Sequence, residues 1–120
     1  MAETKNYKGS CHCGNVRYNV DADLSGELST CNCSICARNG WVLTFVPAEQ
    51  FHLEEGENAL TDYQFGNKTI HHLFCSKCGV RSFARGTMPD GTAMRAINVR
   101  CLEGVDVNTL NLKQFDGRSI

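Results

Sequence analysis

Hydrophobic and polar residues alternate with a period of two in several short stretches of the chain. Residues 16–20 place an apolar side chain at every second position, which is typical of a strand with one buried face. Residues 41–46 are almost continuously apolar and precede Pro47, so we predict a buried strand followed by a turn. Further short strands are predicted at residues 51–53, 63–65, 70–74, 80–84 and 92–102.

The period of an amphipathic helix is weak throughout the chain. No window of eleven or more residues supports it, apart from a faint pattern at residues 107–112. Turn signals rich in glycine separate the predicted strands at residues 55–56, 65–67, 85–86 and 89–91. Many short strands, frequent turns and little helix favour a mainly β fold, and the length suits a single domain over residues 1–120.

Composition and charge exclude several classes of protein. A hydrophobic share of 42% and a charged share of 21% describe a folded globular chain. The longest apolar run, residues 41–46, is far shorter than the roughly 18–20 residues that span a bilayer, so no membrane partner is predicted. With 12 basic and 13 acidic residues and no basic stripe, we do not expect nucleic acid as a partner. The first ten residues lack an apolar signal segment, so we predict a cytoplasmic protein with reduced thiols.

Seven of the 8 cysteines fall into three clusters, and this spacing favours metal binding over disulfides. Disulfides between such near neighbours are strained, whereas neighbouring thiolates can turn onto one ion. Clustered thiolates select zinc or iron–sulfur centres, and none of the spacings matches a ferredoxin run, so we predict zinc. Gly14 and Gly79 each follow a cluster and supply the positive φ that a metal-binding turn needs. The clusters are Cys11 and Cys13; Cys31, Cys33 and Cys36; and Cys75 and Cys78.

Counting ligands divides the clusters into two sites. A structural zinc site is closed by four protein ligands, whereas a catalytic site keeps one position open. The two pairs together close a four-thiolate site that joins Cys13 to Cys75. The remaining cluster supplies three ligands from a single loop and leaves a fourth position for water or substrate.

Cys101 stands alone and leaves a second division open, in which it closes the three-cysteine site. Against this, Cys101 follows Ile97 and Val99 on the apolar face of a predicted strand, where a free thiol behaves as a small hydrophobic group. We therefore interpret Cys101 as a core residue, with metal ligation as the alternative.

The cysteines also lie within longer sequence patterns. Residues 9–16 read Gly-Ser-Cys-His-Cys-Gly-Asn-Val, residues 31–40 read Cys-Asn-Cys-Ser-Ile-Cys-Ala-Arg-Asn-Gly, and residues 74–79 read Phe-Cys-Ser-Lys-Cys-Gly. This order resembles the glutathione-dependent formaldehyde-activating enzyme family, which includes the centromere protein V type. The resemblance runs from about residue 8 to beyond residue 106, and residues 98–104 are similar to a late strand segment of the family.

The resemblance implies an Mss4-like fold, a β-sheet tent built around zinc. It implies a structural zinc ion held by Cys11, Cys13, Cys75 and Cys78. It also implies a second, more weakly held zinc ion at Cys31, Cys33 and Cys36, which are then the catalytic residues. The activity named for the family is the condensation of glutathione with formaldehyde to S-hydroxymethylglutathione, a carbon–sulfur lyase reaction written in reverse. The implied partners are a small thiol, glutathione or similar, and a small aldehyde.

Glutathione carries two carboxylates, so cations are expected beside the three-cysteine site. Arg38, two residues after Cys36, is the candidate by position, and Lys77, Arg81 and Arg85 are further candidates. The alternative for each is a solvated surface charge. Trp41 is interpreted as a core aromatic residue or as a wall of a pocket beside the three-cysteine loop.

The histidines offer one further chemical group. His71 and His72 are adjacent in a predicted strand, so they face opposite sides, and one of them could carry a proton near the zinc. The alternative is a strand histidine with no catalytic role. His12 and His52 are interpreted as a loop residue and as a solvent-facing strand residue.

Two other functions compete with the enzyme. The first is a non-enzymatic binding module with two closed structural zinc sites, in which Cys101 or a histidine supplies the eighth ligand. The second is a redox switch that ejects metal from the three-cysteine loop on oxidation.

Overall fold

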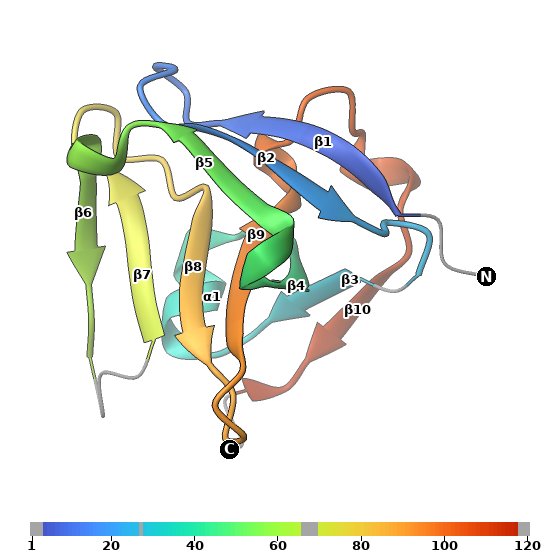
Figure 1. Ribbon diagram of the computed structural model, residues 1–120. Coiled ribbons are helices and arrows are strands. Elements are labelled where there is room, and N and C mark those ends of the chain that lie inside the picture. Colours follow the sequence, from blue (N-terminus) through green and yellow to red (C-terminus); the bar gives the residue numbers. More distant parts are fainter. Residues whose placement is uncertain (1–3, 27, 66–69, 118–120) are drawn as a thin grey trace.

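Two β-sheets form the framework of the computed structural model, which describes residues 4–26, 28–65 and 70–117 (Figure 1). The described strands are β1 (Lys5–Ser10), β2 (Arg17–Ala22), β3 (Leu28–Cys31), β4 (Leu43–Pro47), β5 (Phe51–Glu55), β6 (Leu60–Tyr63), β7 (Ile70–Cys75), β8 (Phe83–Thr87), β9 (Ala93–Asn98) and β10 (Leu112–Phe115). One short helix, α1 (Ser34–Asn39), and four 3-10 turns (Ala48–Gln50, Glu57–Ala59, Val99–Cys101 and Val107–Thr109) complete the described elements. The predicted mainly β fold is confirmed.

The smaller sheet has the strand order β1-β2-β5, and the larger has the order β10-β3-β4-β9-β8-β7-β6. All pairings are antiparallel except that of β10 with β3, which is parallel. Figure 1 shows the smaller sheet lying across one end of the larger one, as a cover over its upper part. Among the described residues, none of the helices has the length and apolar character to cross a membrane.

The main core lies where the two sheets meet. The rings of Tyr18 and Phe51 from the smaller sheet pack on Phe83 of β8, with centroid separations of 5.0 Å between Tyr18 and Phe51, 5.8 Å between Tyr18 and Phe83, and 4.5 Å between Phe51 and Phe83. Ile97 of β9 is completely buried beneath them. Buried aromatic rings at these separations add about 0.5–1.5 kcal/mol per pair beyond the area that they bury.

A second, smaller core covers the opposite face of the larger sheet. Because side chains alternate along a strand, Phe83 and Ile97 face the main core, while their neighbours Ala84 and Ala96 face the other side. Trp41, Leu43 and Ala84 form this second core, with Ala96 and Cys36 packed against it. This face of the sheet carries the candidate functional site.

Several predicted boundaries differ from the structure. The strand predicted at residues 63–65 lies three residues earlier, at β6. The strand predicted at residues 80–84 begins only at Phe83, and the strand predicted at residues 92–102 ends at Asn98. The weak helical pattern at 107–112 corresponds to a single 3-10 turn followed by β10, and part of the turn predicted at 65–67 lies outside the described residues. The sequence patterns also missed β1, β3 and β10, because β1 and β10 are largely exposed and polar and β3 has only four residues.

Candidate functional site

The first cysteine cluster joins the turn between β1 and β2 to the turn between β7 and β8. Sγ of Cys13 lies 3.6 Å from Sγ of Cys11 and 3.6 Å from Sγ of Cys75. The four sulfurs of Cys11, Cys13, Cys75 and Cys78 all lie within 4.8 Å of one another. Two sulfurs bound to one tetrahedral zinc ion at about 2.3 Å lie about 3.8 Å apart. The four thiols therefore fit a closed zinc site of the kind predicted from the sequence.

Both turns use the same local geometry. The carbonyl oxygen of Cys11 accepts a hydrogen bond from the N–H of Gly14, and that of Cys75 accepts one from Gly79, at 3.3 and 2.8 Å. Gly14 and Gly79 have φ angles of 83° and 79°, as predicted, so each can close the turn without strain. Backbone N–H groups of Cys13 and Val80 donate toward the sulfur of Cys78 and lower the pKa of that thiol to about 6. The turn thus favours the thiolate that a metal ion binds.

The second cluster is built on a strand end and a helix. Cys31 ends β3, Cys33 is the N-cap residue of α1, and Cys36 lies one turn further along that helix. Their three sulfurs lie within 4.8 Å of one another, and the N–H of Cys33 donates to Sγ of Cys31 at 3.5 Å. The sequence predicted a single loop here. The helix escaped prediction because six residues are too few to show a helical period.

Helix α1 also sets different environments for its two cysteines. Burial opposes ionisation of Cys33, but the N–H groups of Cys36 and Ile35 at the helix start outweigh it and leave the pKa of Cys33 below its usual value. Burial raises the pKa of Cys36 to about 12, while the indole N–H of Trp41 acts in the opposite direction. Nε1 of Trp41 is buried without a hydrogen-bond partner among the described residues. A metal-bound thiolate at Cys36 would supply the acceptor that this N–H lacks, so the cluster fits a second zinc ion.

The segment after β10 covers the second cluster. The N–H of Asn32 donates to the carbonyl oxygen of Phe115 at 3.2 Å, and Nδ2 of Asn32 donates to Asp116 at 2.8 Å. A Cβ atom at Gly117 would lie 2.7 Å from Sγ of Cys31. Only glycine allows the backbone to approach the cluster this closely.

A pocket of about 460 Å³ opens beside the three cysteines. Besides Cys31, Cys33 and Cys36, its described lining consists of Ser29, Ile35, Trp41, Leu43, Phe45, Phe65, Ile70, His72, Ala84, Ala96 and Phe115. Trp41 is 3% exposed and belongs to both the second core and the pocket wall, so both interpretations of this residue hold. Most of the lining beyond Trp41 and the cysteines was missed by the sequence, because these walls come from distant segments.

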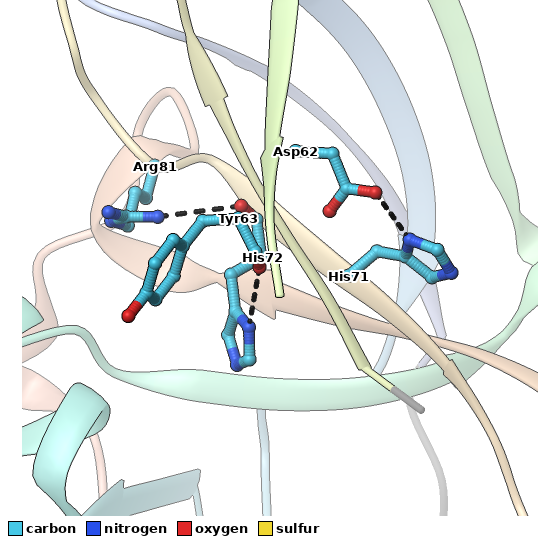
Figure 2. A network of polar contacts seen from close by, with 5 residues as sticks. All are labelled: Asp62, Tyr63, His71, His72 and Arg81. Atoms are coloured by element: carbon cyan, nitrogen blue, oxygen red, sulfur yellow. Dashed lines mark hydrogen bonds and ion pairs between the residues drawn. The ribbon is translucent and has the colours of Figure 1, made fainter. Parts of the chain in front are cut away.

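His71 and His72 face opposite sides of β7, as predicted (Figure 2). His71 pairs with Asp62 on one side. On the other side, Nδ1 of His72 lies 3.1 Å from the carbonyl oxygen of Tyr63. Because a carbonyl only accepts, Nδ1 carries the proton and Nε2 is left as an acceptor. Burial lowers the pKa of His72, and the ring stacks on Phe65 with a centroid separation of 5.2 Å, so a neutral imidazole lines the pocket.

The predicted cations lie in three different places. Arg38 is exposed on α1 and lines a hollow of about 290 Å³ together with Arg81, and Trp41 lines both this hollow and the pocket. Arg81 lies over the ring of Phe74, 4.8 Å from its centroid. Arg85 faces away from the cluster, on the side of the sheet that carries Phe83, and Lys77 lies in the turn of the four-cysteine cluster. Of the four candidates, Arg38 and Arg81 are therefore the two brought near the pocket.

Cys101 lies outside both clusters. It belongs to the 3-10 turn Val99–Cys101 rather than to a strand, so the predicted strand face is wrong at this position. Its half-buried sulfur accepts a hydrogen bond from Nδ2 of Asn98 at 3.6 Å, and burial raises the pKa of the thiol. His12 and His52 are both exposed, as the sequence predicted.

The fold and the two clusters define a class, the Mss4-like β domains that gather cysteines into metal-binding groups. The family model described as glutathione-dependent formaldehyde-activating enzyme matches residues 6–112, and the chain belongs to this family. Among solved structures, the chain is similar to a Rhodobacter sphaeroides protein, determined as a structural genomics target, with 30% sequence identity and a TM-score of 0.76. That likeness covers 88% of this chain and 99% of the other. The resemblance read from the cysteine patterns is confirmed.

Proposed function

We propose that the protein is a zinc-dependent carbon–sulfur lyase that adds a small thiol, glutathione or similar, to formaldehyde or a related small aldehyde. The observation that carries the proposal is the convergence of three thiols, Cys31, Cys33 and Cys36, on a pocket that also contains the acceptor nitrogen of His72. Three ligands leave a coordination position for a reactant, as in catalytic rather than structural zinc sites.

The two clusters have separate roles in this proposal. Cys11, Cys13, Cys75 and Cys78 hold a zinc ion that fastens the smaller sheet to the larger one. Cys31, Cys33 and Cys36 hold the second ion, which when bound stabilises a thiolate near neutral pH and polarises a carbonyl group.

The reaction itself needs one proton transfer and no oxidant. A bond forms between the thiol sulfur and the carbonyl carbon, the carbonyl π bond breaks, and the proton of the thiol ends on the carbonyl oxygen. We propose that Nε2 of His72 takes the thiol proton and returns it to that oxygen, since its other nitrogen is occupied as a donor to Tyr63. The reverse reaction uses the same groups in the opposite order.

Arg38 and Arg81 are proposed to bind the carboxylates of glutathione. Both line the hollow that shares Trp41 with the pocket, so a thiol that extends along Trp41 could place its sulfur near the cysteines and its carboxylates near the two guanidinium groups. Arg38 also donates to the carbonyl oxygen of Ser34 at 2.9 Å, which holds its side chain along α1.

The test is the substitution Cys33→Ser, with Cys101→Ser as the matched control. Exchange between free formaldehyde, glutathione and their adduct is followed by NMR, and zinc content is measured on the same samples. We expect Cys33→Ser to keep its fold and one zinc ion but to lose exchange. Cys101→Ser is expected to keep its fold, both zinc ions and exchange. Unchanged exchange in Cys33→Ser would show that this cluster is not catalytic. A fourth protein ligand at the second ion, seen by X-ray absorption, would instead favour the binding module.

A further inference from the structure

We infer that the aldehyde substrate carries an apolar substituent, aryl or branched aliphatic, that fills the pocket beside Cys31, Cys33 and Cys36. The inference rests on the proposed function and narrows its substrate. Formaldehyde has only hydrogen atoms on its carbonyl carbon, so it would leave this pocket empty.

The lining of the pocket selects against charge. Apart from the three cysteines, Ser29 and His72, every described lining residue is apolar, and the described lining includes no lysine, arginine, aspartate or glutamate. A charged substituent would lose its hydration there without gaining a partner. The volume of about 460 Å³ lies within the range of pockets that hold small organic ligands.

Exposed hydrophobic side chains gather at this pocket. Seven large hydrophobic residues are exposed among those described, and four of them, Phe45, Phe65, Ile70 and Phe115, line the pocket. They come from β4, the segment after β6, β7 and β10, so the sheet topology rather than one apolar stretch brings them together. Such a concentration marks a binding site, because scattered exposed hydrophobic residues would need no explanation.

Two small residues keep the pocket open. Ala84 of β8 and Ala96 of β9 are register partners, and both lie on the face that carries the second core. Larger side chains at these positions would occupy the space that the substituent needs. Because the two alanines belong to central strands of the larger sheet, the floor of the pocket is rigid.

The reactive groups identify the occupant as a small molecule. The three thiols and the imidazole of His72 line the same cavity as the apolar side chains. An aldehyde with an apolar substituent uses both sets of residues at once, with its carbonyl group at the cysteines and its substituent against the rings. The charged parts of the thiol lie in the other hollow, with Arg38 and Arg81.

The first experiment compares aldehydes with the zinc-loaded protein. Adduct formation with glutathione is measured by NMR for formaldehyde, 3-methylbutanal and the anionic aldehyde glyoxylate, and each rate is divided by the uncatalysed rate of that aldehyde. We expect the acceleration for 3-methylbutanal to exceed that for formaldehyde by about tenfold or more. In an enzyme pocket, one buried methylene group changes the rate ratio between two substrates by about tenfold or more. Glyoxylate is expected to show the smallest acceleration.

A pocket-filling variant tests the residues. Ala96→Leu is expected to lower the ratio of the 3-methylbutanal acceleration to the formaldehyde acceleration by about tenfold. Ala93→Leu, at an exposed position of the same strand, is expected to leave that ratio unchanged. An equal or larger acceleration for formaldehyde in the unmodified protein would overturn the inference and leave the proposed function standing. No acceleration with any aldehyde would overturn the proposed function, and the inference with it.

A binding measurement gives a readout that does not depend on activity. The chain contains a single tryptophan, Trp41, and it lines the pocket, so tryptophan fluorescence reports on ligand binding there. We expect 3-methylbutan-1-ol, an unreactive analogue, to change the emission of the unmodified protein at concentrations at which methanol does not, and Ala96→Leu to abolish the change. The inference would be overturned if the fluorescence does not respond to the alcohol and sedimentation shows a dimer that Phe45→Ser dissociates. That result would show instead that a second copy of the chain covers this surface.

Discussion

His72 donates through Nδ1 to the carbonyl oxygen of Tyr63, across the pairing of β7 with β6. This hydrogen bond fixes the tautomer, and with it the nitrogen that is available to a substrate. The neighbouring His71 has the same ring chemistry, but it faces Asp62 on the other side of the sheet. One position along the strand therefore decides which of two adjacent histidines lines the pocket and is available for the proposed reaction.

The buried ring of His72 predicts a stability that depends on pH. Burial lowers the pKa of His72 in the folded protein below the ordinary value of 6.5 that applies to the unfolded chain. Between the lowered pKa and pH 6.5, the unfolded chain therefore binds more protons than the folded one. The contribution is therefore fully present above pH 6.5 and is lost as the pH falls from 6.5 through the lower pKa of the folded protein. We expect urea unfolding to show a smaller loss of stability from pH 7 to pH 5.5 in His72→Gln than in the unmodified protein, at equal zinc content. His52→Gln, at an exposed strand position, should behave like the unmodified protein.

Loss of one thiol from the four-cysteine cluster should destabilise the fold. Cys75→Ser removes the ligand that ends β7 and lies against Cys13, which weakens the link between the two sheets. We expect the free energy of unfolding to fall by roughly 2–5 kcal/mol and the zinc content to fall by one ion, measured by chemical denaturation and elemental analysis. Cys101→Ser should change the free energy of unfolding by less than about 1 kcal/mol, because that sulfur lies outside both clusters. A similar loss in both variants would contradict the structural role of the four-cysteine site.

The close approach of Gly117 to Cys31 predicts an effect on the second metal ion alone. In Gly117→Val the new side chain collides with Sγ of Cys31, so the segment after β10 has to move off the cluster. We expect one zinc ion to be lost to a chelator about tenfold faster, while the other ion and the unfolding midpoint stay unchanged. Gly26→Ala is the control, because a Cβ there meets no atom within 4 Å. Equal release from both sites would mean that the cover stabilises the whole fold rather than the cluster.

The placement of Arg38 beside Arg81 predicts discrimination between thiols. Arg38→Gln should raise KM for glutathione by roughly fivefold, the equivalent of about 1 kcal/mol for a solvent-exposed charge pair. KM for the uncharged thiol 2-mercaptoethanol should not change. Arg100→Gln, an exposed arginine that does not line the hollow, should leave both values unchanged. An equal rise for both thiols in Arg38→Gln would point to a distorted helix α1 instead of a lost carboxylate contact.

The cysteine clusters could be recognised in the sequence because the spacing within each cluster is local, and the structure brings them together as the two predicted groups. Cys75 and Cys78 lie within one turn, and thiols spaced two or three residues apart indicate metal binding without any knowledge of the fold. The apolar rim of the pocket could not be predicted, since Phe45, Phe65 and Phe115 become neighbours only when β10 pairs with β3 and β7 folds beside β8. An exposed phenylalanine looks the same in the sequence whether it stands alone or in a group.

The same limit applies to the cations. The sequence proposed Arg38 because it lies two residues after Cys36, and in the structure it lines the hollow that shares Trp41 with the pocket rather than the pocket itself. Helix α1 turns the side chains of Cys36 and Arg38 in different directions, because residues two apart on a helix do not face the same side. The register of a helix of six residues is set by its contacts, and those contacts are not visible in the sequence.

The parallel pairing of β10 with β3 has a consequence for the order in which the protein is completed during synthesis. All four ligands of the first cluster have been made once residue 78 has emerged, so that site can close while the chain is still growing. The ligands of the second cluster emerge much earlier, by residue 36, yet their cover at residues 115–117 follows only after the other strands of the larger sheet have been made. Until residues 115–117 have been made, the three thiols of the second cluster lack this cover. The first cluster can therefore close before the second is covered, and this is the order in which we expect the two sites to be completed.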